Sequence, residues 1–337
     1  MSLSQLARSV WTSLPLSWRQ SRLVQRLKRR LRPRAAADAT VAASATPIRT
    51  VSTLEELDEA LKHLDQLAAI SDEELRRGFH QFHMRFPLQV PEDPDSAAYR
   101  ENQWKLYEWL HGKPYSVEHE STRFDIQEAA TSPFPYHTQG AQTVGNHLIG
   151  IGHLIRTMNL PAGNKILELG PGWGNTTLEL ARMGYQVTAI DIEKNFVDLI
   201  HERARRKGLA VEVHQGDFAS IADFARQKRS FDAVLFFECF HHCADHQRLV
   251  GLLDAVVAPG GQVVFAAEPI TDDFPLPWGL RLDGESLWAI RKHGWLELGF
   301  QEKYFRQLLG RHGWELEKSV CSETPWGVVF TARRRSG

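Results

Sequence analysis

Apolar residues in the first half of the chain recur every three or four positions, as they do on one face of an amphipathic helix. The clearest run is Leu54, Leu57, Leu61, Leu64 and Leu67. A capping-box pattern begins at Thr53, so a helix is predicted to start there. A second capping pattern begins at Ser71, ahead of Phe79 and Phe82, and we expect Pro87 to close that second helix.

Two more helices are predicted before the pattern changes. A stretch near 96–111 carries aromatic residues at helical spacing and is followed by Gly112, a residue type that commonly ends helices. After a passage that contains Pro and Gly, residues 141–158 are again helical in pattern. The expected division of the chain is a segment 1–50, a helical cap 51–140, and a main domain 141–337 with an insertion at 268–300.

Short apolar runs alternate with helical stretches in the second half of the chain. The runs are 165–169, 186–190, 210–214, 232–237 and 262–267. Alternation of this kind is typical of parallel strands joined by helices. The stretches 314–320 and 327–332 are separated by a short turn and can pair as an antiparallel hairpin at the sheet edge. The predicted fold is therefore an α/β, doubly wound, mostly parallel seven-stranded sheet with an antiparallel edge hairpin and an N-terminal helical region.

Composition and charge exclude several classes of protein. The 337 residues are 42% hydrophobic and carry a formal net charge of -1, so nothing in the overall charge attracts nucleic acid, and no such partner is expected. No apolar run reaches the length of a membrane span. The three cysteines are too few for a disulfide framework and fit a reducing, cytoplasmic location.

The start of the chain is locally basic. No acidic residue precedes Asp38, whereas Arg and Lys residues are interleaved with apolar ones over residues 1–34. Such a basic amphipathic segment can make peripheral contact with an anionic membrane or dock on a partner, and it also resembles a transit peptide. A solvated tail is the plainer interpretation. Residues 35–50, rich in Ala, Thr and Ser, are the expected linker.

Residues 165–174 hold the most informative pattern in the chain. An apolar run is followed directly by Gly170, Gly172 and Gly174 at alternate positions. Glycine lets the backbone turn sharply and come close to a ligand. A helix is expected from Asn175, and its N-terminal amides would favour a carboxylate or phosphate at the same place. Alone, this pattern fits a dinucleotide, a phosphate or a carboxylate.

Acidic residues follow at the ends of the next predicted strands. Asp191 lies 21 residues after Gly170, where a carboxylate can accept hydrogen bonds from both hydroxyls of a ribose. Asp217 and Phe218 end the third strand, where an acid and a ring can meet an adenine. Asn175 stands where a dinucleotide fingerprint has its third glycine, so an NAD-binding oxidoreductase is a weaker alternative.

A group of cysteines and histidines follows the fourth predicted strand. It consists of Cys239, His241, His242, Cys243 and His246. The spacing matches no common zinc pattern, and some of these side chains should point into the core. We therefore predict no metal site.

Taken together, the glycine loop, Asp191, Asp217 and the later Gly260 and Gly261 resemble the class I S-adenosylmethionine-dependent methyltransferase family. The resemblance implies an enzyme that uses S-adenosylmethionine as cofactor. It also implies that Glu168 and the loop with Gly170, Gly172 and Gly174 hold the methionine part, Asp191 the ribose, and Asp217 with Phe218 the adenine. Ile192 and Tyr136 complete the expected cofactor set, Tyr136 from a lid in the N-terminal portion.

Three residues after the fourth strand are candidates for catalysis. The reaction requires an acceptor in line with the methyl carbon and, for a hydroxyl acceptor, usually a base. His242 is the preferred base, with His241 and Glu238 behind it; a structural role for either histidine is the plainer alternative. Trp173 and the spacing from Glu238 to His242 are also similar to cyclopropane fatty acid synthases, which act on lipid alkenes.

The acceptor is expected to bind outside the cofactor core. The insertion 268–300 places aromatic residues beside charged ones, as a carbohydrate site would; they are Glu268, Asp272, Asp273, Trp278, Arg281, Asp283, Glu285, Trp288, Arg291 and Trp295. The predicted function is methylation of a hydroxyl of a glycan or small molecule. A silent cofactor-binding scaffold that docks through residues 1–34 is the alternative of a different class.

Overall fold

The computed structural model describes residues 48–85, 90–132 and 140–335. The described residues all belong to one compact unit, residues 47–337. The basic segment 1–34, most of the predicted linker and Tyr136 lie outside the described residues, so membrane contact through the basic segment stays a prediction. Within the described ranges, no helix has the length and apolar character needed to cross a membrane.

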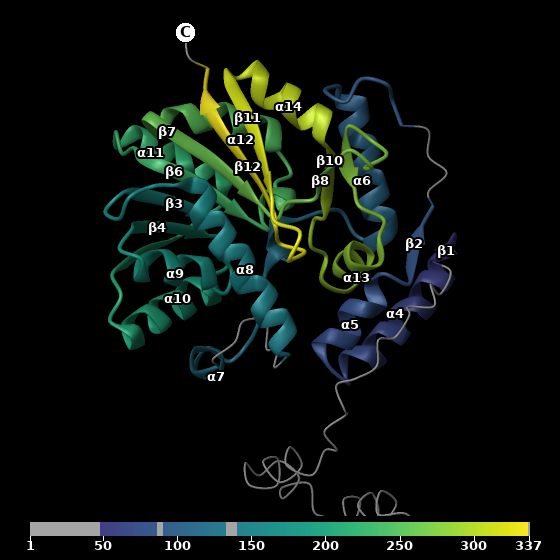
Figure 1. The fold of residues 1–337 in the computed structure, drawn as a ribbon. Coiled ribbons are helices and arrows are strands. Elements are labelled where there is room, and N and C mark those ends of the chain that lie inside the picture. Colours follow the sequence, from purple (N-terminus) through teal and green to yellow (C-terminus); the bar gives the residue numbers. More distant parts are fainter. Residues whose placement is uncertain (1–47, 86–89, 133–139, 336–337) are drawn as a thin grey trace, which may run out of the picture. The chain divides into compact units, whose positions relative to one another are not determined.

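A seven-stranded sheet forms the centre of this unit (Figure 1). Its strands are β3 (Lys165–Leu169), β4 (Gln186–Asp191), β5 (Val211–Gln215), β6 (Phe231–Phe237), β7 (Val257–Ala266), β11 (Trp314–Val320) and β12 (Val328–Arg334). They lie in the order β11-β12-β7-β6-β3-β4-β5. All neighbours are parallel except β12, which pairs antiparallel with both β7 and β11. The predicted doubly wound sheet with an antiparallel edge hairpin is confirmed.

Alternating side chains along the strands build two hydrophobic layers. Ala233, Leu235 and Phe237 of β6 join one cluster, and Val234 and Phe236 join the other. The first layer is covered by α8 (Ala141–Met158), α9 (Asn175–Arg182) and α10 (Lys194–Lys207). The second is covered by α11 (Ile221–Arg226), α12 (His246–Leu252) and α14 (Glu302–Arg311). Both faces of the sheet are therefore buried, as parallel sheets require.

The N-terminal helices begin where the capping patterns place them. Thr53 and Ser71 cap α4 (Leu54–Ala68) and α5 (Asp72–Phe79) by accepting hydrogen bonds from the backbone. The third helix, α6 (Ala97–His111), ends at Gly112 in a left-handed conformation. Two short elements follow before α8 in the described part of the chain, η1 (Val117–Glu120) and α7 (Ile126–Thr131).

The prediction that the second helix continues past Phe82 was wrong. The helix stops at Phe79, and β2 (Phe82–Met84) pairs in parallel with β1 (Arg49–Val51). Side chains of Phe82 and Met84 are buried while His83 between them is exposed, which is strand alternation and not helical periodicity. The expected stop, Pro87, lies outside the described residues.

The insertion packs against the N-terminal helices. It contains β8 (Ile270–Thr271), β9 (Trp278–Leu280), α13 (Gly284–His293) and β10 (Leu298–Gln301), whose strands form a small sheet in the order β8-β10-β9. The hydroxyl of Tyr99 donates to the carbonyl of Trp278 over 2.5 Å, and that of Tyr107 to the carbonyl of Gly294 over 2.5 Å. Gln103 Oε1 accepts from the Leu280 amide at 3.0 Å. These two regions, far apart in sequence, form one accessory layer (Figure 1).

Candidate active site

A cavity of about 490 Å³ lies at the carboxyl ends of β3, β4 and β6. The strand order changes direction here, because the chain passes from β3 to β4 and β5 on one side and to β6 and β7 on the other. In open α/β sheets, ligands bind in the crevice at such a switch point. The volume is that of a small-molecule site.

The glycine loop forms one wall of the cavity. Gly170, Gly172 and Gly174 all have positive φ angles, of 61°, 50° and 71°. A Cβ at Gly170 would lie 2.7 Å from the Cβ of Cys239, whereas a Cβ at Gly172 would meet nothing within 4 Å. Gly170 and Gly172 line the cavity; Gly174 instead occupies the N-cap of α9 and packs on Ile200.

Two acids at adjacent strand ends are fixed by hydrogen bonds. Glu168 is buried and accepts from the Thr177 hydroxyl over 2.5 Å, and burial raises its pKa to about 7. Asp191 accepts from the Gly172 and Glu193 amides, each over 2.9 Å. Burial raises the pKa of Asp191 to about 6, although these two amides lower it. Asp191 thus holds the glycine loop while two of its lone-pair sites remain for a ligand.

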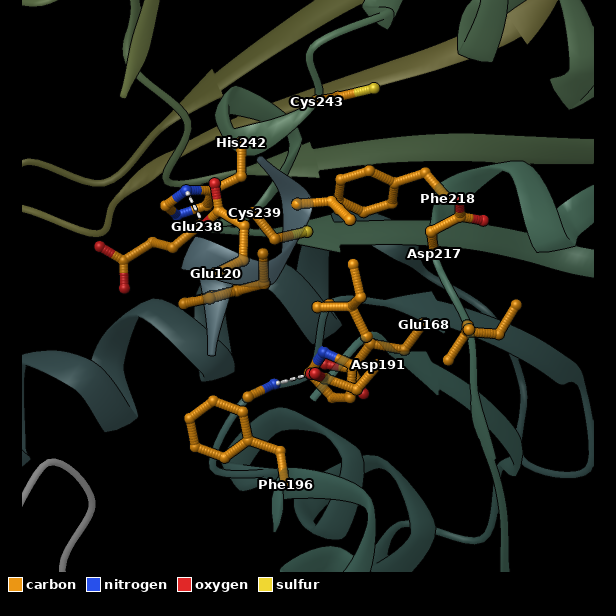
Figure 2. A pocket seen from close by; sticks show the side chains of 18 of the residues that line it. Glu120, Glu168, Asp191, Phe196, Asp217, Phe218, Glu238, Cys239, His242 and Cys243 are labelled. Carbon is orange, nitrogen blue, oxygen red and sulfur yellow. Dashed lines mark hydrogen bonds and ion pairs between the residues drawn. The ribbon is translucent and has the colours of Figure 1, made fainter. Parts of the chain in front are cut away.

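The next strand end contributes another acid and a ring. Asp217 caps η3 (Phe218–Ser220) and, with Phe218 and Ile192, lines the cavity. Figure 2 shows Asp217 and Phe218 across the cavity from His242. Sequence reasoning missed Phe196 on α10, whose ring completes a wall with Trp173 at 5.3 Å between centroids. In the sequence, Phe196 is one apolar residue of an amphipathic helix, and that spacing predicts only an ordinary position in the hydrophobic core.

A buried carboxylate from the end of β7 shapes the loop after β6. Glu268 Oε1 accepts from the amides of Cys239 and Phe240, each over 2.9 Å. Its Oε2 accepts from the amide of His241 over 3.2 Å and lies 2.7 Å from Nδ1 of the same residue. Burial raises the pKa of Glu268, but His241 and the amides outweigh it and hold the pKa below its ordinary value. Glu268 therefore fixes η4 (Phe240–His242) on the sheet.

The three catalytic candidates occupy different environments. His242 and Glu238 line the cavity, whereas His241 is buried behind it between Glu268 and Glu297, with Nε2 3.6 Å from Glu297. Glu238 adopts φ 51°, a left-handed conformation that non-glycine residues rarely hold without a functional or packing reason. Burial and the nearby Glu285 raise the pKa of Glu238 to about 7.

Sequence reasoning also missed Glu120, which meets His242 in the cavity. Glu120 Oε2 lies 3.4 Å from His242 Nδ1 (Figure 2). Burial lowers the pKa of His242, but the carboxylates of Glu120, Glu297 and Glu268 outweigh burial and raise it to about 9. Glu120 belongs to η1 and lies 122 residues before His242, in a segment without a motif, so no local pattern could have found it.

The cysteine and histidine group does not gather into one site. The Cys239 thiol donates to the Leu169 carbonyl over 2.8 Å, and His246 is enclosed by aromatic rings. His241, His242 and Glu297 do bring ligand atoms within 4.8 Å of one another. In the described chain these three residues form ion pairs, His241 with Glu268, His242 with Glu120, and Glu297 with Arg281. The absence of a metal stays a prediction.

Most residues proposed for a carbohydrate site in the insertion have other partners. Of that set, Trp295 alone appears among the described residues that line the cavity. Trp278 is buried and donates from Nε1 to the Pro94 carbonyl, and Trp288 packs on Phe79. Arg281 pairs with Asp283 and Glu297. Tyr115, Val117 and Glu120, from the segment after α6, line the cavity together with Trp295.

Comparison with known proteins gives a sequence match over the core. The family described as "Methyltransferase domain" matches residues 167–265. A ubiquinone biosynthesis O-methyltransferase of Xanthomonas axonopodis pv. citri is 32% identical over 103 residues, which cover 31% of this chain and 42% of the relative. One from Methylocella silvestris is 34% identical over 105 residues, which cover 31% of this chain and 40% of that relative. The chain thus spans about two fifths of these relatives.

Solved structures also align with the chain. Magnesium protoporphyrin IX methyltransferase from Synechocystis PCC 6803 aligns with a TM-score of 0.45 and 15% identity, over 63% of this chain and 94% of that one. A Burkholderia thailandensis 1,6-didemethyltoxoflavin-N1-methyltransferase aligns with a TM-score of 0.41 and 19% identity, over 59% of this chain and 80% of that one.

Replacing Glu268 tests its role in fixing the loop. In Glu268→Gln, one carboxamide oxygen cannot accept from all four donors, so at least two buried N–H groups lose their acceptor. We expect the free energy of unfolding to fall by about 2–4 kcal/mol. Urea denaturation measures this, with the exposed Glu315→Gln as the matched control. A change in Glu268→Gln no larger than in the control would contradict the assignment.

Gly170 tests the close approach of the two loops. Gly170→Ala combines a left-handed backbone, which costs about 1–2 kcal/mol for an L-residue, with a clash against Cys239 of about 1–3 kcal/mol. Gly208→Ala is the matched control, because Gly208 has φ 64° and open space around its Cβ position. The free energy of unfolding should fall further in Gly170→Ala than in Gly208→Ala; equal losses would show that the contact with Cys239 is unimportant.

Proposed function

We propose that this chain, which carries a class I S-adenosylmethionine-dependent methyltransferase domain over residues 167–265, methylates a hydroxyl oxygen of a small molecule or glycan. The observation that carries the proposal is the convergence of Glu168, Asp191 and Asp217, from three strand ends, on one cavity beside the glycine loop. The domain match supports the cofactor class. The identity of the acceptor rests on the residues at the far end of the cavity.

The residues present fit the cofactor. Gly172 lines the cavity with φ 50° and open space at its Cβ position, so its backbone is accessible to a ligand, and α9 begins at Asn175 without a side-chain cap. Its free amides suit a carboxylate, such as that of a methionine moiety. Asp191 with Ile192 would hold the ribose, and Asp217 with Phe218 the adenine. When bound, S-adenosylmethionine supplies an electrophilic methyl carbon and a neutral sulfur leaving group.

The charge of the cavity favours this cofactor over a dinucleotide. Acidic side chains from five segments line it, among them Glu120, Glu168, Asp191, Asp217 and Glu238. A sulfonium and an ammonium group are attracted to these carboxylates, whereas a pyrophosphate would be repelled. The acidic lining therefore disfavours the binding of NAD, which the oxidoreductase alternative requires.

The acceptor end supports an oxygen nucleophile. His242 and Glu120 lie together there, and Tyr115 and Trp295 provide flat apolar surfaces for a ring. His242 would take the hydroxyl proton as the acceptor oxygen forms its bond to carbon. A lipid alkene, the acceptor of the cyclopropane-synthase alternative, offers no partner to the charged pair of Glu120 and His242. The two sequence relatives are O-methyltransferases, which agrees with oxygen as the acceptor atom.

Calorimetric titration tests the cofactor site. Wild-type protein should bind S-adenosylmethionine, and Asp191→Asn should bind it at least about tenfold more weakly, since a charged acceptor of ribose hydrogen bonds is lost. Asp223→Ala, an exposed change outside the cavity, is the control and should leave affinity unchanged. Binding of NAD in place of S-adenosylmethionine would support the oxidoreductase, and no binding would refute the methyltransferase.

Turnover separates an enzyme from a silent scaffold. Protein incubated with S-adenosylmethionine that carries an isotopic methyl label, and with small-molecule and glycan extracts of the native host, should place label in an alkali-stable methyl ether. Mass spectrometry then identifies the acceptor. Label in a methyl-branched or cyclopropane lipid would favour the lipid alternative, and cofactor binding without any transfer would favour the scaffold.

A further inference from the structure

Glu120 is held in one orientation by groups from two regions. Its Oε1 accepts from the Tyr115 hydroxyl over 3.1 Å and from the Leu296 amide over 2.8 Å. The Tyr115 ring is stacked on Trp104 of α6, with centroids 5.6 Å apart and an interplanar angle of 9°. Because these contacts occupy Oε1, the other oxygen is directed at His242.

His242 presents its two ring nitrogens to different surroundings. Nδ1 is buried, lies 3.4 Å from Glu120 Oε2 in an ion pair, and has no hydrogen-bond partner among the described residues. The side chain is 25% exposed and lines the cavity. With Nδ1 directed at Glu120, Nε2 is the nitrogen that remains for a ligand. A carboxylate on Nδ1 selects the tautomer whose Nε2 can accept a proton.

We propose that Glu120 is a positioning residue that orients His242 as the base of methyl transfer, so that the N-terminal cap supplies part of the catalytic apparatus. The inference rests on the proposed function. In the step, the acceptor O–H bond breaks, its proton passes to Nε2, and the oxygen electron pair forms the bond to the methyl carbon. The electron pair of the broken carbon–sulfur bond stays on sulfur.

Several charged groups face His242 and decide how it titrates. They are Glu120 from η1, Glu268 after β7, Glu297 before β10, Asp191 at the end of β4, and the neighbouring ring of His241, 4.3 Å away between centroids. His241 is enclosed by Glu268 and Glu297, whereas Glu120 is the carboxylate nearest to His242. We therefore expect removal of the charge of Glu120 to lower the pKa of His242 more than removal of the charge of Glu268 or Glu297.

The experiment compares the full-length wild type with Glu120→Gln, which keeps the shape of the side chain and removes its charge. Nitrogen NMR of the imidazole, recorded with S-adenosylhomocysteine, follows the protonation and tautomer of His242 without an acceptor. The wild type should titrate near pH 9 and hold its proton on Nδ1 above that pH. In Glu120→Gln the pKa should fall by at least about one unit, as expected when an opposite charge is removed.

The rate of methyl transfer supplies the second readout. In the wild type the rate should rise tenfold per pH unit up to about pH 9. In Glu120→Gln the rise should end at lower pH, and the plateau should be at least about tenfold lower because the base is weaker and less well oriented. Glu118→Gln, an exposed change on the same η1 turn, should behave as the wild type in both measurements.

Three results would overturn the proposal. The first is a His242 titration in Glu120→Gln that matches the wild type. The second is a proton on Nε2 in the neutral form of the wild type. The third is a rate abolished by a chelator and restored by a divalent metal, which would assign activation of the acceptor to the metal. Loss of S-adenosylmethionine binding in the wild type would refute the proposed function, and calorimetric titration of the wild type detects that failure separately from these three results.

Discussion

The contact between Glu268 and the loop after β6 is the constraint on which the rest of the site depends. One buried carboxylate satisfies three successive backbone amides and an imidazole. Without it, those donors would be buried and unpaired beside the sheet, at a free-energy penalty for each. Because the loop is fixed here, Cys239 meets Gly170 and His242 faces the cavity. The position of the glycine loop and that of the candidate base are therefore set together.

A second constraint comes from the accessory layer. The N-terminal helices and the insertion share buried hydrogen bonds from Tyr99, Gln103 and Tyr107 to backbone groups of β9 and Gly294. The same junction holds Glu120, through the Leu296 amide. A sheet of this type has its ligand crevice at the carboxyl ends of the strands, and Tyr115, Glu120 and Trp295 of the accessory layer line that crevice here. The accessory layer also places the carboxylate of Glu120 beside His242, which follows strand β6 of the main sheet.

The parts of the structure that were predictable are those with local signals. Strand runs, the capping residues Thr53 and Ser71, and the acids at strand ends each follow from patterns within a few residues. The pairing of Glu120 with His242 and the role of Glu268 depend on tertiary contacts between distant segments, which no spacing encodes. Phe82 was misassigned for a related reason, since its strand exists only through pairing with β1. The aromatic residues Trp278 and Trp288 of the insertion likewise pack against the N-terminal region and do not line the cavity.

The electrostatics of the cavity link cofactor binding to stability. Burial raises the pKa of Glu168 to about 7 and that of Asp191 to about 6. At any pH between the ordinary pKa of such a group and its raised pKa, the folded chain therefore binds more protons than the unfolded chain. The free energy of unfolding contributed by these groups therefore falls as pH rises through that range. A cation among the carboxylates stabilises their ionised forms and removes the loss. A sulfonium cofactor would thus stabilise the folded chain most at neutral pH and above, where the buried carboxylates are ionised and lower the free energy of unfolding.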